Sequence, residues 1–176
     1  MKNKMDFLHA YELAHELKSE LADVCDHIEI AGSIRRKCDL IGDIEFVARP
    51  KYEIGEHDLF GIPTWKSMLW PRLDAMSAER KIVYTKTGNL YRQFLWPQVQ
   101  VDLFTATAEN WGWILLMRTG SADFSHRVAR CLNREGFTSA GGNIIDTRDG
   151  RTVSTPSEQD VFRLAGMEWL EPKHRL

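Results

Sequence analysis

Residues 32–36 read Gly-Ser-Ile-Arg-Arg, and residues 42–45 read Gly-Asp-Ile-Glu. Asp43 and Glu45 are two positions apart in a run that alternates between polar and apolar residues, which is the pattern of a β-strand. Successive side chains of a strand point to opposite faces of a sheet, so these two carboxylates would project from the same face. The Gly-Ser pair of the first motif predicts a turn between this strand and an earlier one.

A third carboxylate, that of Asp102, belongs to the same predicted sheet. Alternation with Val101 and Leu103 would place Asp102 on the opposite face from these apolar residues. Carboxylates clustered on a sheet repel one another unless divalent cations neutralise them, and oxygen ligands suit Mg²⁺ or Mn²⁺ better than zinc. The alternative is that the acids are ordinary solvent-facing residues of an antiparallel sheet.

The Gly-Ser turn has the chemistry of a phosphate site. Gly32 would let the backbone approach a phosphate, Ser33 and exposed amides would donate hydrogen bonds to it, and an arginine would bind its oxygens in bidentate fashion. Alone, the motif fits a helix cap with surface arginines equally well. Beside the carboxylates, it predicts a triphosphate held next to two metal ions, one activating an attacking hydroxyl and the other stabilising the leaving pyrophosphate.

Hydrophobic periodicity predicts an α+β protein whose first lobe covers residues 1–105. Residues 50–80 carry several prolines and glycines without a clean period, so we expect an irregular segment, with a helix starting near Pro71 as the alternative. The other elements would form a mixed sheet of about five strands with flanking helices. They are a helix over 5–25, strands over 27–30 and 43–48, a hairpin over 81–96 and a strand over 99–105.

The second lobe, residues 106–176, is predicted to be small and mostly helical. We expect helices over 106–117 and 121–135, and a short hairpin over 143–154. Ser121 is positioned to cap the second of these helices, and Ser157 with Asp160 to cap a last one.

Composition limits the class of protein. The chain has 176 residues, a net charge of -2 and a mean hydropathy of -0.36, which are typical of a soluble globular protein. It has no apolar run of the ~20 residues needed to span a bilayer and no apolar signal core, so we expect an intracellular protein that is neither secreted nor bound to a membrane. The three cysteines are too widely spaced for a zinc knuckle and are expected to be free thiols.

The near-neutral net charge hides an uneven distribution. Residues 1–31 carry three basic and seven acidic side chains, whereas residues 118–134 carry four basic and one acidic. In the latter segment, Arg127, Arg130 and Arg134 fall on one face of the predicted helix. We predict that these arginines, with the adjacent His126, contact DNA phosphates, the alternative being an ordinary solvated helix face.

The two motifs, at this spacing, resemble those of the family X DNA polymerases, a DNA polymerase beta-like branch of the nucleotidyltransferase superfamily. Further resemblance lies in the family's thumb, in Thr-Gly-Ser at 119–121, Glu-Gly-Phe-Thr at 135–138, Ser-Glu-Gln-Asp-Val-Phe at 157–162 and Glu-Pro-Lys-His-Arg at 171–175. The run Gln-Val-Asp-Leu-Phe-Thr-Ala at 100–106 is most similar to compact viral members that consist of a palm and a thumb alone. The resemblance implies a nucleotidyltransferase palm followed by a thumb, with no preceding lyase domain.

The resemblance also implies roles for individual residues. Asp43, Glu45 and Asp102 would be catalytic and would ligate two Mg²⁺ ions, with Mn²⁺ as an alternative. The nucleotide would be bound by Gly32, Ser33, Arg36 and Gly42 around the phosphates and by Gly120 and Ser121 around the sugar and base. The chain departs from the family pattern at Glu45, where aspartate is usual, and at Met117-Arg118, where an aromatic pair often helps to exclude ribonucleotides.

The function implied is template-directed DNA synthesis. The protein would use deoxynucleoside triphosphates to extend a primer on primer-template or gapped DNA, releasing pyrophosphate, in the manner of short-gap repair, and would act as a monomer. Two alternatives are a template-independent nucleotidyltransferase acting on RNA or another hydroxyl acceptor, and a catalytically silent DNA-binding remnant.

Overall fold

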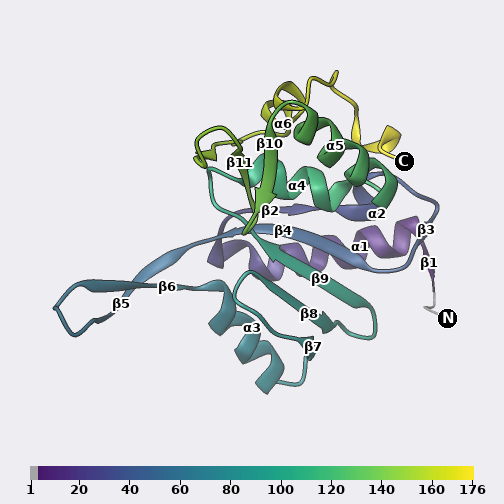
Figure 1. The fold of residues 1–176 in the computed structure, drawn as a ribbon. Coiled ribbons are helices and arrows are strands. Elements are labelled where there is room, and N and C mark those ends of the chain that lie inside the picture. Colours follow the sequence, from purple (N-terminus) through teal and green to yellow (C-terminus); the bar gives the residue numbers. More distant parts are fainter. Residues whose placement is uncertain (1–3) are drawn as a thin grey trace.

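A computed structural model describes residues 4–176. Its centre is a five-stranded sheet in the order β2-β4-β9-β8-β7, in which β4 and β9 are parallel and the other neighbours antiparallel (Figure 1). The predicted mixed sheet of five strands is therefore confirmed. The strands are β2 (Cys25–Ile30), β4 (Ile44–Pro50), β7 (Val83–Lys86), β8 (Tyr91–Leu95) and β9 (Gln100–Thr105).

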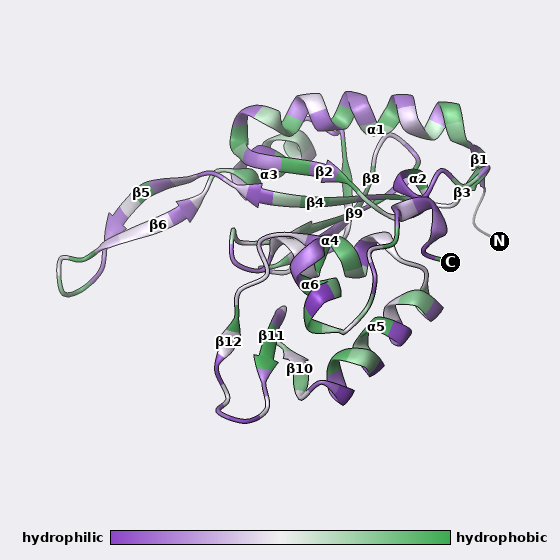
Figure 2. Ribbon diagram, turned by 90° about the horizontal axis from the view of Figure 1, so that it is seen from above, coloured by the Kyte–Doolittle hydropathy of each residue, from purple (hydrophilic) through white to green (hydrophobic). Residues whose placement is uncertain are grey.

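Two helices, α1 (Phe7–Leu21) and α3 (Leu69–Ala78), share one hydrophobic core with the sheet. Ala10, Ala14 and Leu17 are fully buried on α1, as the period of that segment predicts. The short 3₁₀ helix η1 (Ala22–Val24) leads into β2. Figure 2 shows α1 along one side of the sheet and the C-terminal helices on the other, so the sheet is a layer between them.

Short elements connect the strands that carry the two motifs. The predicted Gly-Ser turn is a single helical turn, α2 (Gly32–Arg35), directly after β2. The two-residue strand β3 (Leu40–Ile41) then pairs with β1 (Met5–Asp6) and ties the start of the chain to the approach to β4. The first motif is thus held at the edge of the central sheet, next to the second.

Residues 50–80 are regular, so the expectation of an irregular segment was wrong. Strands β5 (Tyr52–His57) and β6 (Pro63–Ser67) form a hairpin that projects from the body (Figures 1 and 2), and α3 follows it, starting two residues before Pro71. Ile54 and Trp65 pair across the hairpin and are both exposed. Because no core covers either face, neither strand needs the one-sided apolar pattern by which strands are predicted.

The C-terminal lobe contains the three predicted helices and a small sheet. The first helix starts later than predicted because the Asn110 side chain accepts a hydrogen bond from the Thr107 amide and holds a turn there. Ser121 caps the second, and Ser157 and Asp160 form a capping box on the third, as predicted. The predicted hairpin gains a third strand. The elements are α4 (Trp111–Thr119), α5 (Ala122–Arg134), β10 (Phe137–Ala140), β11 (Asn143–Asp146), β12 (Thr152–Val153), α6 (Glu158–Leu164) and η2 (Pro172–His174).

Each lobe has its own hydrophobic core, and a smaller cluster joins the two lobes. That cluster packs Ala31 and Val47 of the sheet lobe against Ala106 and Leu115. The predicted boundary between residues 105 and 106 lies at the end of β9 and stays a prediction. In the part of the chain that the structure describes, no helix has the length and apolar character needed to cross a membrane.

Candidate active site

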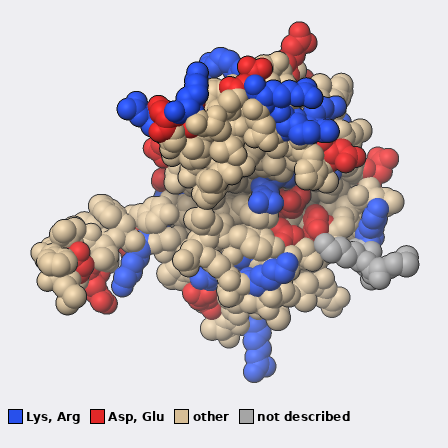
Figure 3. All heavy atoms as spheres, viewed as in Figure 1, with Lys and Arg blue, Asp and Glu red and all other residues tan. Residues whose placement is uncertain are grey.

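The parallel pairing of β4 with β9 brings the carboxylates of the two motif strands together. Glu45 lies directly opposite Asp102 in the register of the two strands, and Asp43 immediately precedes β4. Asp102 is buried, with 8% of its surface exposed. Figure 3 shows acidic side chains in the hollow between the two lobes. The structure therefore pairs Glu45 with Asp102 on neighbouring strands, whereas Asp43, predicted to lie on the strand, comes one residue before it, and the role of these acids as metal ligands stays a prediction.

Three side chains hold the Asp102 carboxylate in place. The Tyr91 hydroxyl and the Gln93 amide, the latter at 2.8 Å, donate to its Oδ1, and the Gln100 amide donates to its Oδ2 at 2.7 Å. Burial and the bond to Asp102 raise the pKa of Tyr91, which therefore stays a donor. Sequence reasoning missed these partners, although Gln93 lies opposite Asp102 in the β8–β9 register and Gln100 lies two positions before Asp102 on β9.

The environment of Glu45 disfavours its negative charge. Burial, and after it the charges of Asp43 and Asp102, raise the pKa of Glu45 to about 7, while Arg118 and Arg36 act weakly in the other direction. At neutral pH a carboxyl with this pKa is only partly ionised, because burial and the neighbouring negative charges disfavour its charged form. The site therefore has the electrostatic character of one that a cation completes.

The donor set fits hard divalent cations by its chemistry. Three carboxylates supply only oxygen atoms, as Mg²⁺ and Mn²⁺ prefer. Over residues 4–176, no three His, Cys, Asp or Glu side chains are already arranged around a common point as metal ligands. The fit therefore rests on the identity of the donors and on their mutual repulsion.

Gly32 is required at its position for two reasons. Its φ is +60°, in the left-handed region that favours glycine, and a Cβ atom there would overlap Oε2 of Glu45. The Glu45 carboxylate thus lies against the Cα of the turn that the sequence predicts to bind phosphate. The Ala31 amide donates to the Glu45 carbonyl at 2.8 Å and fixes this approach. Nucleotide binding by Gly32, Ser33 and Gly42 stays a prediction.

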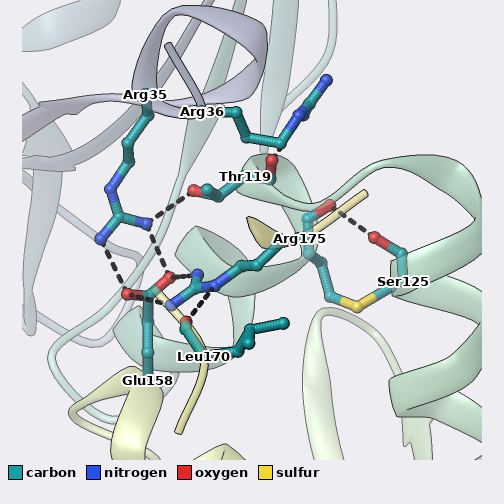
Figure 4. A network of polar contacts seen from close by, with 8 residues as sticks. Arg35, Arg36, Thr119, Ser125, Glu158, Leu170 and Arg175 are labelled. Atoms are coloured by element: carbon teal, nitrogen blue, oxygen red, sulfur yellow. Dashed lines mark hydrogen bonds and ion pairs between the residues drawn. The ribbon is translucent and has the colours of Figure 1, made fainter. Parts of the chain in front are cut away.

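Arg36 reaches from α2 to the C-terminal lobe. Its Nη1 donates to the Thr119 carbonyl at 2.5 Å, directly before Gly120 (Figure 4), and its buried Nε has no hydrogen-bond partner among the residues described. The Ser121 hydroxyl has a structural role, since it accepts a hydrogen bond from the Phe124 amide and caps α5. The structure thus brings three predicted nucleotide-binding residues, Arg36, Gly120 and Ser121, to one junction of the two lobes, and their contacts with a nucleotide stay predictions.

Beside the carboxylates, aromatic and cationic side chains line a cleft between the lobes. A cavity of about 510 Å³ lies between Tyr91 and Phe104 of the sheet and Arg118 and Gly142 of the C-terminal lobe. The Tyr91 and Phe104 rings are stacked 4.6 Å apart, and the Arg118 guanidinium lies 3.8 Å from the Phe104 centroid. Arg118 therefore lies in a cation–π contact near the site, in the place where the sequence departs from the family pattern.

The predicted basic face is present on α5. Arg127, Arg130 and Arg134 are exposed, and none of them forms an ion pair with another described side chain, while Phe124 and Val128 are buried on the opposite face. The exposed His126 lies on the same helix and borders a cavity of about 590 Å³. Figure 3 shows basic side chains gathered over this lobe. DNA contact by these four residues stays a prediction.

Comparisons with known proteins agree with this geometry. Residues 114–176 match the family described as DNA polymerase beta thumb. Over 166 residues the chain is 22% identical to the Repair DNA polymerase X of African swine fever virus (strain Badajoz 1971 Vero-adapted), and the match covers 93% of this chain and 90% of the viral protein. An 81-residue segment, 46% of this chain, is 32% identical to human DNA-directed DNA/RNA polymerase mu, but spans only 16% of that protein.

A solved structure shares the fold over nearly the whole chain. The polymerase beta of Leishmania infantum, solved as a ternary P/T complex, superimposes with a TM-score of 0.78 and 17% sequence identity. The match covers 99% of this chain and 77% of that chain. The predicted fold class is therefore confirmed by a second route.

Proposed function

Since the chain belongs to the family X DNA polymerases, we propose that it adds deoxynucleotides to the 3′-hydroxyl of a DNA primer under the direction of a template, and that its substrates are short gaps in DNA. Support comes from the similarity to a repair polymerase over most of both chains and from the match to the thumb family. The observation that carries the proposal is the group of acids on β4, directly before it and on β9, whose repulsion of the Glu45 charge calls for a cation.

In this proposal, Asp43, Glu45 and Asp102 hold two divalent cations, which when bound neutralise the phosphates and acidify the primer hydroxyl. The chain's own residues supply orientation. Tyr91 and the two glutamines orient the Asp102 carboxylate, which in this proposal is the one nearest the primer 3′-hydroxyl. Arg36, with one guanidinium nitrogen bound to the Thr119 carbonyl, presents the rest of its charge to the triphosphate.

Extension of a labelled primer tests the function. We expect incorporation on gapped and primer-template DNA with Mg²⁺ or Mn²⁺, and faster incorporation on the gapped substrate. Asp43→Ala and Asp102→Ala should each lower incorporation by on the order of 10³-fold, because each removes charge stabilisation of the transition state. Glu56→Gln, on the projecting hairpin, provides the matched control, since this carboxylate is 90% exposed and remote from the site.

The same assay separates the alternatives. Incorporation without template would identify a template-independent transferase, and absence of incorporation under every condition would identify a DNA-binding remnant. Full activity of Asp43→Ala or Asp102→Ala would contradict the assignment of the acids. Parallel reactions with ribonucleotides measure how strongly the protein discriminates between deoxyribose and ribose. The question arises because Met117-Arg118 replaces the family's aromatic pair, and the Arg118 side chain lies on Phe104 instead.

A further inference from the structure

Glu158, the first residue of α6, joins the two lobes through two guanidinium groups (Figure 4). From the sheet lobe, Arg35 donates Nη1 to its Oε1 and Nη2 to its Oε2, both at 2.7 Å. From the C-terminal end of the chain, Arg175 donates Nη1 to Oε1 at 2.5 Å and Nη2 to Oε2 at 3.3 Å. A single carboxylate thus accepts two bidentate ion pairs, the strongest geometry available to such groups.

The pair of Glu158 and Arg175 is a fixed part of the C-terminal lobe. Arg175 is fully buried, its Nε donates to the Leu170 carbonyl at 2.9 Å, and its guanidinium lies 4.8 Å from the Trp169 ring centroid. The start of α6 is held as firmly, since a Cβ on Gly112 of α4 would overlap the Ser157 backbone. Neither partner is able to move without disturbing the core of this lobe.

Arg35 comes instead from α2, the turn that carries Ser33 and Arg36. Besides Glu158, Nη1 of Arg35 donates to the Thr119 hydroxyl at 2.7 Å, while Nη1 of Arg36 donates to the Thr119 carbonyl. Thr119 is fully buried and ends α4, immediately before Gly120. Two consecutive arginines therefore hold both polar ends of one residue, and Arg35 extends that hold to α6.

We propose that Arg35 is a positioning residue for nucleotide binding: through Glu158 and Thr119 it fixes the C-terminal lobe against α2, so that Arg36 and the Gly120-Ser121 turn meet the same nucleotide, Arg36 at its phosphates and the turn at its sugar and base. The inference rests on the proposed function. Its physical basis is that Arg35 is the only one of the three ion-pair members that belongs to the sheet lobe. Removal of its side chain leaves Glu158 neutralised by Arg175, so the C-terminal lobe keeps its fold, and of the arginine contacts to this lobe only the bond from Arg36 to the Thr119 carbonyl remains.

Arg35→Ala tests this in kinetics and in structure. We expect the KM for the incoming nucleotide to rise about tenfold with a smaller change in kcat, because the groups that bind the nucleotide lose their mutual registration while the carboxylates stay in place. Arg35→Lys, which keeps the charge but lacks the bidentate fork, should recover part of the loss. Arg163→Ala is the matched control, since it removes another ion pair of α6, one that is 76% exposed on the arginine side.

The second measurement does not depend on catalysis. Spin labels on cysteines introduced at the exposed Tyr11 of α1 and Asn133 of α5, with the native cysteines replaced, report the distance between the lobes by pulsed electron resonance. The Arg35→Ala distribution should be broader than that of the parent or of Arg163→Ala. Should Arg35→Ala fail to fold, Arg35→Gln takes its place in both measurements. An unchanged distribution, or an unchanged KM in an active enzyme, would overturn the inference, whereas inactivity of the parent protein would count against the proposed function alone.

Discussion

Two glutamates, the half-buried Glu45 on the central sheet and the buried Glu158 at the seam that Arg35, Glu158 and Arg175 form between the lobes, have their pKa values shifted in opposite directions. Burial and neighbouring carboxylates raise the pKa of Glu45 to about 7. Burial acts on Glu158 in the same sense, but hydrogen bonds and charges from Arg35 and Arg175 outweigh it and lower the pKa of that carboxyl. The residue type and the direction in which burial shifts the pKa are shared, so the difference lies in the charged partners.

The contrast separates a functional charge from a structural one. Glu158 is neutralised by side chains of its own chain, and its ion pairs close the seam. The charges of Arg118 and Arg36 only partly offset the effects of burial and of two acids on Glu45, and the Cα of Gly32 lies against its carboxylate. Such a charge lowers the free energy of unfolding, and a ligand of opposite charge that binds the folded state restores it.

The largest effect expected from this comparison is that of Glu158→Gln. The variant leaves the fully buried Arg175 facing a neutral amide, and loss of one member of a buried pair costs about 3–5 kcal/mol of the free energy of unfolding. Urea denaturation at pH 7 measures it. Glu171→Gln, which breaks an exposed ion pair with Lys173, should change the unfolding free energy very little.

The effect of Glu158→Gln should also depend on pH. A carboxyl whose pKa is lowered on folding stabilises the protein above its ordinary value of 4.5, and this stabilisation is lost as the pH falls through the folded-state pKa. The difference between wild type and variant should therefore shrink in acid. An equal difference at neutral and strongly acidic pH would contradict the lowered pKa.

Glu45→Gln should act in the opposite direction. Between pH 4.5 and about 7, the folded state retains a proton that the unfolded state has released, so wild-type stability falls as the pH rises through this window. At pH 8 and without added metal, the variant should be more stable by about 1–3 kcal/mol, and below pH 4.5 the advantage should vanish. Thermal and urea unfolding across this range measure it.

Addition of Mg²⁺ or Mn²⁺ sharpens the same test. If cations complete the site, either ion should raise the melting temperature of wild type at pH 8 and raise that of Glu45→Gln less, because binding to the folded state alone stabilises it. An identical metal response in both proteins would show that Glu45 does not contribute to a metal site.

The two regions also differ in how much of them the sequence predicts. Glu45 and Asp102 were placed on one face because alternation within a strand is a local property that survives in the fold. The seam joins Arg35, Glu158 and Arg175, of which the first is more than a hundred positions from the others. Periodicity carries no signal for such a contact. The sequence predicted only that Glu158 lies at the start of a helix capped by Ser157 and Asp160. The projecting hairpin was missed because its strands pack on no core.

The smallest effect concerns arginines that form no ion pair with a described residue, in contrast to Arg35 and Arg175. Arg127 and Arg130 are exposed on α5 and form no ion pair with a described residue, so DNA phosphates are their expected partners. Replacement of both by alanine should weaken DNA binding roughly tenfold and reduce the slope of log K against log salt by about 1.8, since each lost phosphate contact removes about 0.9. Fluorescence anisotropy of labelled gapped DNA between 50 and 200 mM salt, roughly the range over which such contacts are sensitive, measures both.

The control for this last prediction is a pair of exposed arginines that, unlike Arg127 and Arg130, form ion pairs. Arg148 and Arg151 are also exposed, but each is paired with an aspartate, Asp146 and Asp149 respectively. Removing these two arginines changes the net charge by the same amount as removing Arg127 and Arg130, so a general electrostatic effect would weaken DNA binding equally in both double variants. If the α5 arginines bind phosphate directly, only their replacement lowers the salt slope, because counterion release requires a contact and not merely a charge of the right sign.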